Sequence, residues 1–123
     1  MGFFKKKNAF EGLNYLELTP IKRYEHIEKE TGLIDVLVPR FNDKFFGKIL
    51  QPRIKNKYIK ANLDDIGSMT WILIDGTNQV YQIADSLTEQ FGERVEPSHD
   101  RLIAFLNQLY RNDFIYFKEI RKD

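Results

Sequence analysis

The spacing of apolar residues changes near residue 64 of this 123-residue chain. Before that point apolar and polar residues alternate in short runs, which is the period of β-strands. After it, apolar residues recur every three or four positions, which is the period of helices. The pattern therefore predicts a small sheet followed by helices.

Three runs in the first half are candidate strands. Residues 22–29 (KRYEHIEK) form a polar one, and residues 33–40 (LIDVLVPR) form the strongest one because they are rich in Val, Ile and Leu. Thr31–Gly32 is the predicted turn between them. Residues 57–63 (KYIKANL) alternate again, with Ile59, Ala61 and Leu63 on one face and Tyr58, Lys60 and Asn62 on the other. Residues 41–56, which lie between the last two runs, contain a short amphipathic stretch that fits a helical turn or an ordered loop.

The first predicted helix begins at Asp64, which we expect to be the N-cap, with Asp65 in the first turn. It ends at Asp75–Gly76, where glycine accepts the left-handed backbone conformation. Its apolar positions are Ile66, Met69, Thr70 and Leu73, with Trp71 and Ile74 widening the face.

Two further helices and a strand follow in the pattern. Thr77 or Asn78 is expected to cap the second helix and Gly92 to end it, and Ser98 is expected to cap the third. The period shortens again in residues 114–120, which predicts a final strand. The inner positions are Val80, Ile83, Ala84, Leu87 and Phe91 in the second helix, and Leu102, Phe105, Leu106 and Leu109 in the third.

These elements predict an α+β, winged-helix-like fold, in which a small antiparallel sheet of about three strands is followed by a three-helix bundle. The length suits one domain. We expect that domain to occupy residues 21–120, after an N-terminal extension of residues 1–20 in which residues 3–7 (FFKKK) form a tail. A fold of this kind does not by itself decide function.

Composition removes several classes of function. The net charge of +1, from 19 basic and 18 acidic residues, gives no overall attraction to nucleic acid or to an anionic membrane. The chain has no cysteine, which excludes thiolate metal sites and a cysteine nucleophile. It also has no apolar run long enough for a signal peptide or a membrane span, so we expect a cytoplasmic protein.

Catalytic patterns are also missing. His26 and His99 lie in different segments without metal-ligand spacing, and the start of a helix explains the adjacent carboxylates of Asp64 and Asp65. No phosphate-binding, dinucleotide-binding, zinc-protease or serine-hydrolase motif is present. The sequence therefore predicts a protein that is not an enzyme and has no catalytic residue, metal or cofactor.

A nucleic-acid-binding winged-helix regulator is the alternative. The outer face of the third helix carries side chains that can contact bases, and the segment 44–60 is rich in Lys and Arg. Asp100 and Asp113 dilute that charge, however, and phosphate neutralisation supplies most of the affinity of such proteins. The candidate base contacts are Arg101, Ala104, Asn107 or Gln108, and Arg111.

Peptide binding is a further possibility. An exposed sheet edge has unpaired N–H and C=O groups, to which an extended peptide can add as a strand. If residues 57–63 form such an edge and the third helix lies beside it, the two would make a groove with an apolar floor. The alternative is that Tyr58, Lys60 and Asn62 are outward-facing strand residues with no role in binding. A second copy of the chain would satisfy the same edge, which would make a homodimer.

Residues 63–92 (LDDIGSMTWILIDGTNQVYQIADSLTEQFG) carry a resemblance to a known family. Leu63, Asp64, Gly67, Trp71, Leu73–Ile74, Asp75–Gly76, Val80, Ile83 and Phe91 match its pattern, and residues 105–115 (FLNQLYRNDFI) match its third helix and exit. In this stretch, residues 58–117, the chain resembles the PqqD family, small proteins that assist synthesis of pyrroloquinoline quinone, and related recognition elements for ribosomally made, modified peptides.

The resemblance implies a winged-helix-like domain that binds a precursor peptide as an added strand, between the third strand and the third helix. It also implies that the peptide, or a protein segment, is presented to a modifying enzyme, typically a radical-SAM protein. The implied peptide-binding residues are Lys57, Tyr58, Ile59, Lys60, Ala61, Asn62, Leu102, Phe105, Leu106 and Leu109.

Overall fold

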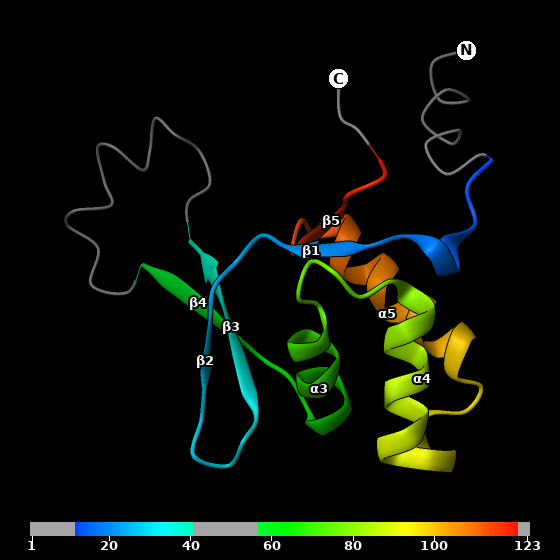
Figure 1. Ribbon diagram of the computed structural model, residues 1–123. Helices are drawn as coiled ribbons and strands as arrows, with labels where there is room; N and C mark the ends of the chain where they lie inside the picture. Colours follow the sequence, from blue (N-terminus) through cyan, green and yellow to red (C-terminus); the bar gives the residue numbers. More distant parts are fainter. Residues whose placement is uncertain (1–11, 41–56, 121–123) are drawn as a thin grey trace. The chain divides into compact units, whose positions relative to one another are not determined.

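The computed structural model describes residues 12–40 and 57–120 (Figure 1). The chain divides into two compact units, which are described in turn. We call residues 24–68 the sheet unit, and residues 1–23 together with 69–123 the helical unit. Small antiparallel sheets and three α-helices are present in the described residues, which confirms the predicted α+β class. The winged-helix arrangement stays a prediction.

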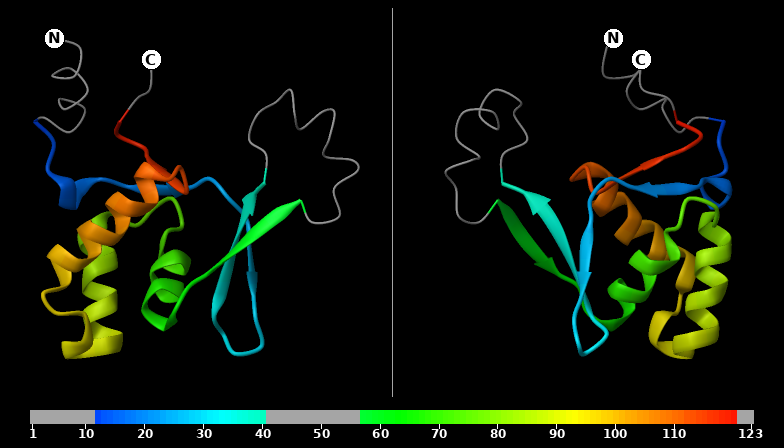
Figure 2. Two further views of the ribbon diagram at one scale, coloured as in Figure 1. Left: turned by 180° about the vertical axis from the view of Figure 1, so that it is seen from behind. Right: turned by 60° about the vertical axis from the view of Figure 1, so that its left-hand side comes forward.

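The described residues of the sheet unit form an antiparallel sheet of three strands in the order β2-β3-β4. Its strands are β2 (His26–Glu28), β3 (Ile34–Pro39) and β4 (Tyr58–Asn62), and the right-hand view of Figure 2 shows β3 in the middle. The predicted strands 33–40 and 57–63 are therefore confirmed. The predicted turn is confirmed as well, since the N–H of Gly32 donates to the carbonyl of Lys29 at 2.8 Å. Residues 41–56 lie outside the described residues.

The predicted strand over residues 22–29 is wrong in extent. Residues 23–25 interrupt it, and β2 covers only His26–Glu28. Lys22 instead ends a separate strand, β1 (Pro20–Lys22), in the helical unit. The polar run carried no apolar alternation that would have distinguished one continuous strand from two short ones.

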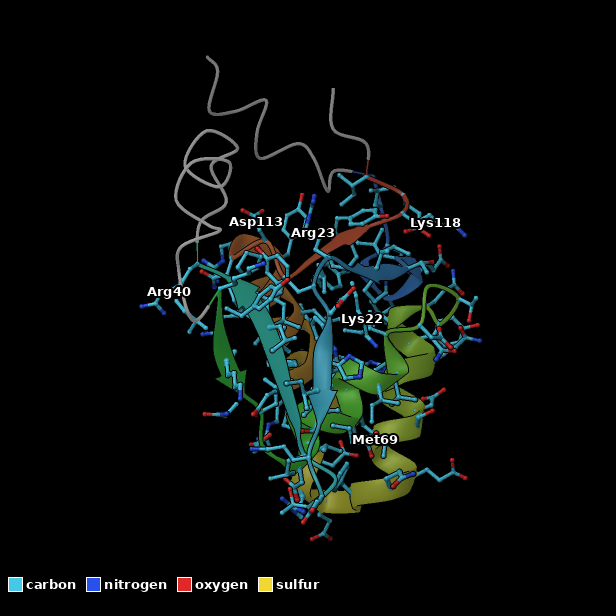
Figure 3. All side chains as sticks on the ribbon, turned by 90° about the vertical axis from the view of Figure 1, so that its left-hand side faces the viewer. Lys22, Arg23, Arg40, Met69, Asp113 and Lys118 are labelled. Carbon is cyan, nitrogen blue, oxygen red and sulfur yellow. The ribbon has the colours of Figure 1, made fainter. Side chains whose placement is uncertain are left out.

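The helical unit contains a second sheet, in which β1 pairs antiparallel with β5 (Ile115–Phe117). This confirms the predicted final strand, but its partner was not predicted. Two hydrogen bonds of 2.7 Å reinforce the pair, since the N–H and the hydroxyl of Thr19 donate to the two carboxylate oxygens of Glu119. Lys22, which is labelled in Figure 3, is the last residue of β1. Its Nζ lies over the ring of Trp71, 5.4 Å from the ring centroid.

The helices of this unit are α4 (Val80–Phe91) and α5 (Ser98–Arg111), which pack against each other. Short 3-10 turns lie before β1 (η2, Tyr15–Glu17) and after α4 (η4, Gly92–Val95). Burial agrees with most of the predicted inner positions; Phe91 and Phe105 are partly exposed. The buried helix residues are Val80, Ile83, Ala84 and Leu87 in α4, and Leu102, Leu106 and Leu109 in α5.

The helix α3 (Asp65–Leu73) begins in the sheet unit and ends in the helical unit. Its predicted cap is confirmed, since Oδ1 of Asp64 accepts the N–H of Gly67 at 2.7 Å. The predicted apolar face is confirmed in part. Thr70, Trp71 and Ile74 are fully buried, whereas Ile66, Met69 and Leu73 are partly exposed. Burial of the large Trp71 side chain decides which face of this weakly amphipathic helix turns inward.

Two predicted caps are corrected by the structure. Gln79 caps α4 in place of Thr77 or Asn78, and its N–H donates to Oε1 of Gln82 at 2.8 Å. Thr77 and Asn78 instead belong to a turn that Asp75 stabilises, because Oδ1 of Asp75 accepts both of their backbone N–H groups. At α5 the cap is Pro97, one residue before the predicted Ser98. Gly92 ends α4 as predicted, with φ +59°.

Candidate functional site

The strand β4 lies at an edge of the sheet formed by the described residues. Two hydrogen bonds fix its pairing with β3: the N–H of Leu63 donates to the carbonyl of Ile34 at 3.0 Å, and the N–H of Arg40 donates to the carbonyl of Lys57 at 2.9 Å. In an antiparallel ladder, bonded and non-bonded residue pairs alternate. The odd-numbered residues of β4 therefore bond to β3, and the backbone N–H and C=O of Tyr58, Lys60 and Asn62 point away from it.

Pro39 supports this assignment. It lies opposite Tyr58, in a pair that exchanges no backbone hydrogen bonds with β4. Proline has no N–H, so it fits a position where the ladder to β4 needs no donor.

Side chains alternate between the two faces of β4. Tyr58, Lys60 and Asn62 share one face, and Ile59 and Ala61 lie on the other, as the sequence alternation predicted. Two large side chains are markedly exposed, with relative accessibilities of 44% for Tyr58 and 52% for Ile59. In contrast, Val36, which is paired with Ala61 in the middle of the sheet, is fully buried. The edge strand thus offers apolar surface on both faces.

A buried carboxylate holds the C-terminal end of β4. Asp35, which is only 5% exposed, lies opposite Asn62, and its Oδ1 accepts a hydrogen bond of 2.6 Å from the side-chain amide of Asn62. Lys29 forms an ion pair with the same oxygen at 3.1 Å. The hydrogen bond from Asn62 is the main cause that holds the pKa of Asp35 below its usual value; Lys29 and Lys60 add to it, and burial opposes it.

Ser68 fastens the start of α3 to the same sheet. Its hydroxyl accepts the N–H of Ile34 at 2.8 Å and donates to the carbonyl of Leu63 at 3.3 Å. Ser68 is buried, and so is Ile34. The residue that follows β4 is therefore held both by β3 and by α3, which keeps the strand edge in a defined conformation.

Sequence reasoning did not single out Asp35, Asn62 as its partner, or Ser68 for this role. A signal was present for the first of these: Asp35 is the one charged residue inside the apolar run 34–38. A carboxylate on a buried central strand requires a hydrogen-bond partner or a counter-charge nearby. No comparable pattern marks Ser68, because its two partners come from other segments of the chain.

The predicted residues of α5 belong to the helical unit. Leu102, Leu106 and Leu109 are buried, and Phe105 is partly exposed. The three leucines are therefore core residues of the helical unit. A contact between any of these four side chains and a peptide stays a prediction.

The remaining candidates for chemistry are dispersed. His26 lies on β2 and His99 on α5, and both are exposed. Asp64 and Asp65 each accept a backbone N–H at the start of α3, as the sequence predicted. In residues 12–40 and 57–120, no group of three or more His, Asp or Glu residues could hold a metal ion. No helix in those ranges is long and apolar enough to cross a membrane.

Two of the candidate base-contacting side chains on α5 are held within the helical unit. The guanidinium of Arg101 donates to the carbonyl of Arg94, and Oδ1 of Asn107 accepts the hydroxyl of Tyr15 at 2.9 Å. Ala104, Gln108 and Arg111 complete the predicted set, and all three are exposed. Most of the predicted Lys/Arg run lies outside the described residues, apart from Lys57 and Lys60.

The described residues thus define a small α+β protein with an unpaired strand edge and no clustered catalytic side chains. A family model described as coenzyme PQQ synthesis protein D (PqqD) matches residues 49–115, more than half of the chain. The chain belongs to the PqqD family. The match contains most of the stretch 58–117 in which the resemblance was found, and it begins earlier, at residue 49. No curated protein and no solved structure matches the chain significantly.

Proposed function

We propose that this protein is a non-catalytic accessory protein of the kind its family's name associates with PQQ synthesis, and that it binds an extended peptide as an added strand on β4. The observation that carries the proposal is the outward orientation of the backbone N–H and C=O groups of Tyr58, Lys60 and Asn62 on an edge strand. Membership of the PqqD family supports a role in cofactor biosynthesis.

Strand addition explains how such a site binds without a deep cavity. Each outward-facing residue of β4 can exchange two hydrogen bonds with the residue opposite it in an antiparallel ligand strand. These bonds involve only the main chain, so they provide affinity with little dependence on sequence. The hydrogen bonds of Asp35 and Ser68 hold the neighbouring backbone in place, which reduces the entropy lost when the ligand binds.

The ligand in this proposal is a precursor peptide or a protein segment, which the protein presents to a modifying enzyme, typically of the radical-SAM class. The exposed side chain of Ile59 is a further contact on β4 itself.

A proline substitution tests the backbone contact directly. Lys60→Pro removes an N–H that points away from β3, so it deletes a donor for the ligand and none for the sheet. Lys60→Ala is the matched control, because it removes the same side chain and keeps the N–H. The ligands are short peptides encoded beside the protein's gene, and binding is followed by amide chemical shifts. For a peptide that binds, Lys60→Pro should weaken affinity by about tenfold or more, since it loses a hydrogen bond and introduces a clash. Lys60→Ala should weaken it much less.

The spectra also show whether the variant is folded, because the β3 amide shifts should stay in place. Equal affinity of the proline variant and the alanine variant, with β3 intact, would exclude strand addition at this edge. A DNA duplex serves as the second ligand. The nucleic-acid-binding alternative would replace the proposal if DNA shifts the amides of Arg101, Asn107 and Arg111 and no peptide shifts any amide. The affinity for DNA should then fall steeply with salt concentration.

A further inference from the structure

The two edges of the three-stranded sheet carry opposite charge. β4 and its flanking residue contribute Lys57 and Lys60, and residues 57–63 contain no acidic residue. The other edge, β2, contains Glu28 and is flanked by Glu25 and Glu30, all three of them exposed. Lys29 lies between Glu28 and Glu30, but it is partly buried and forms the ion pair with Asp35. The β4 edge is therefore the basic one, and a ligand on it meets ammonium groups.

Lys60 is available for such a ligand. Lys29, the other lysine close to Asp35, already forms the ion pair with that carboxylate. Among the described residues Lys60 has no ion-pair partner within 4 Å, and its side chain is exposed. It lies in the middle of β4, on the same residue whose N–H and C=O face outward.

The opposite face of the strand carries Lys57 before its first residue and is apolar beyond it. Ile59 is 52% exposed, and it lies opposite Val38 and beside Val36 on the apolar face of the sheet. In an added strand, the side chain opposite Ile59 falls on this same face, and its neighbours fall on the face of Lys60. An apolar residue there would cover Ile59 and extend the apolar surface of the sheet.

We propose, on the assumption that strand addition at β4 is correct, that this edge selects an extended segment in which carboxylate and apolar side chains alternate. A carboxylate lies opposite Lys60, and an apolar side chain lies opposite Ile59. The same charge disfavours a second copy of β4 as the occupant. Antiparallel self-pairing centred on Lys60 would place two like charges directly opposite each other.

Three capped nonapeptides test the proposal by isothermal titration and amide shifts. The first alternates Val and Glu, the second alternates Val and Lys, and the third has the composition of the first with its Glu residues grouped at one end. Each favourable cross-strand ion pair should tighten binding up to about fivefold. The alternating Val–Glu peptide should therefore bind more tightly than both others, with shifts along β4.

Charge reversal provides the decisive comparison. Lys60→Glu should reverse the preference, so that the Val–Lys peptide binds more tightly than the Val–Glu peptide. Arg111→Glu changes the net charge by the same amount on α5, at an exposed position. This control variant should keep the original preference. Equal reversal by the control would mean that net charge alone decides the preference, and the inference would be wrong.

The outcomes separate the two proposals. If peptides shift β4 amides but bind equally well whatever their charge, strand addition stands and the selection of alternating carboxylates does not. If no peptide, including those encoded beside the gene, shifts β4, the proposed function fails. If sedimentation shows a dimer in which the β4 amides are protected from exchange, a second copy of the chain occupies the edge, and the inference is overturned.

Discussion

Removal of the Ser68 hydroxyl should destabilise the protein measurably. Ser68→Ala leaves the N–H of Ile34 without its acceptor, at a residue that is fully buried. An unsatisfied buried donor costs about 1–3 kcal/mol. Alanine has a higher helix propensity than serine by up to about 0.7 kcal/mol, which offsets part of that loss. We therefore expect a decrease of about 0.5–2.5 kcal/mol in the free energy of unfolding.

Urea unfolding followed by circular dichroism measures the global effect, and hydrogen exchange at Ile34 measures the local one. Ser86→Ala on α4 is the control, because it makes the same chemical change within a helix and should gain only the propensity term. Protection of the Ile34 amide should fall in Ser68→Ala and stay unchanged in the control. If both variants unfold at the same urea concentration and protect Ile34 equally, the reasoning about this buried donor is wrong.

Two further substitutions test the sheet and a turn. The pKa of Asp35 is lowered in the folded state, so its ionisation stabilises the fold above the ordinary carboxyl pKa of about 4, and this contribution is lost as pH falls through the lowered value. The unfolding free energy of Asp35→Asn should therefore fall less steeply than that of the wild type below about pH 4; parallel curves would contradict this. Gly76 has φ +87°, and among the described residues Cδ1 of Ile21 is the one heavy atom within 4 Å of an added Cβ, at an ordinary 3.7 Å. Gly76→Ala should thus cost about 1–2 kcal/mol in urea unfolding through backbone strain alone, and an unchanged midpoint would show that the turn relaxes.

Local patterns were sufficient to predict most of the regular elements. The richness of residues 33–40 in Val, Ile and Leu and the alternation of residues 57–63 mark two strands. Asp64 and Gly92 mark helix boundaries because both act on backbone groups within a few residues of themselves. The edge position of β4 was a hypothesis only, because alternation indicates which face of a strand is exposed and not which strands lie beside it.

Interactions between distant segments could not be predicted in this way. The hydrogen bonds between Thr19 and Glu119 join residues 100 positions apart, and the local sequence around either residue does not indicate its partner. The sequence assigned residues 1–20 to an extension, whereas the structure buries Leu18, Thr19 and Pro20. The cluster of Asp35, Asn62 and Lys29 depends in the same way on strand register, which short-range periodicity does not specify.

The pairing of β1 with β5 has a consequence for the order in which the protein is made. Residues 24–68 form a continuous segment, so every described pairing partner within the sheet unit has been synthesised once Ser68 is added. Of the strands in the described residues, β1 is translated first, yet its partner β5 is translated last. Translation proceeds at about 5–20 residues per second, so β5 is synthesised several seconds or more after β1. Until then the backbone groups of β1 cannot pair with β5. A ribosome stalled before residue 115 should therefore carry a chain whose sheet unit is able to form, while its helical unit is still incomplete.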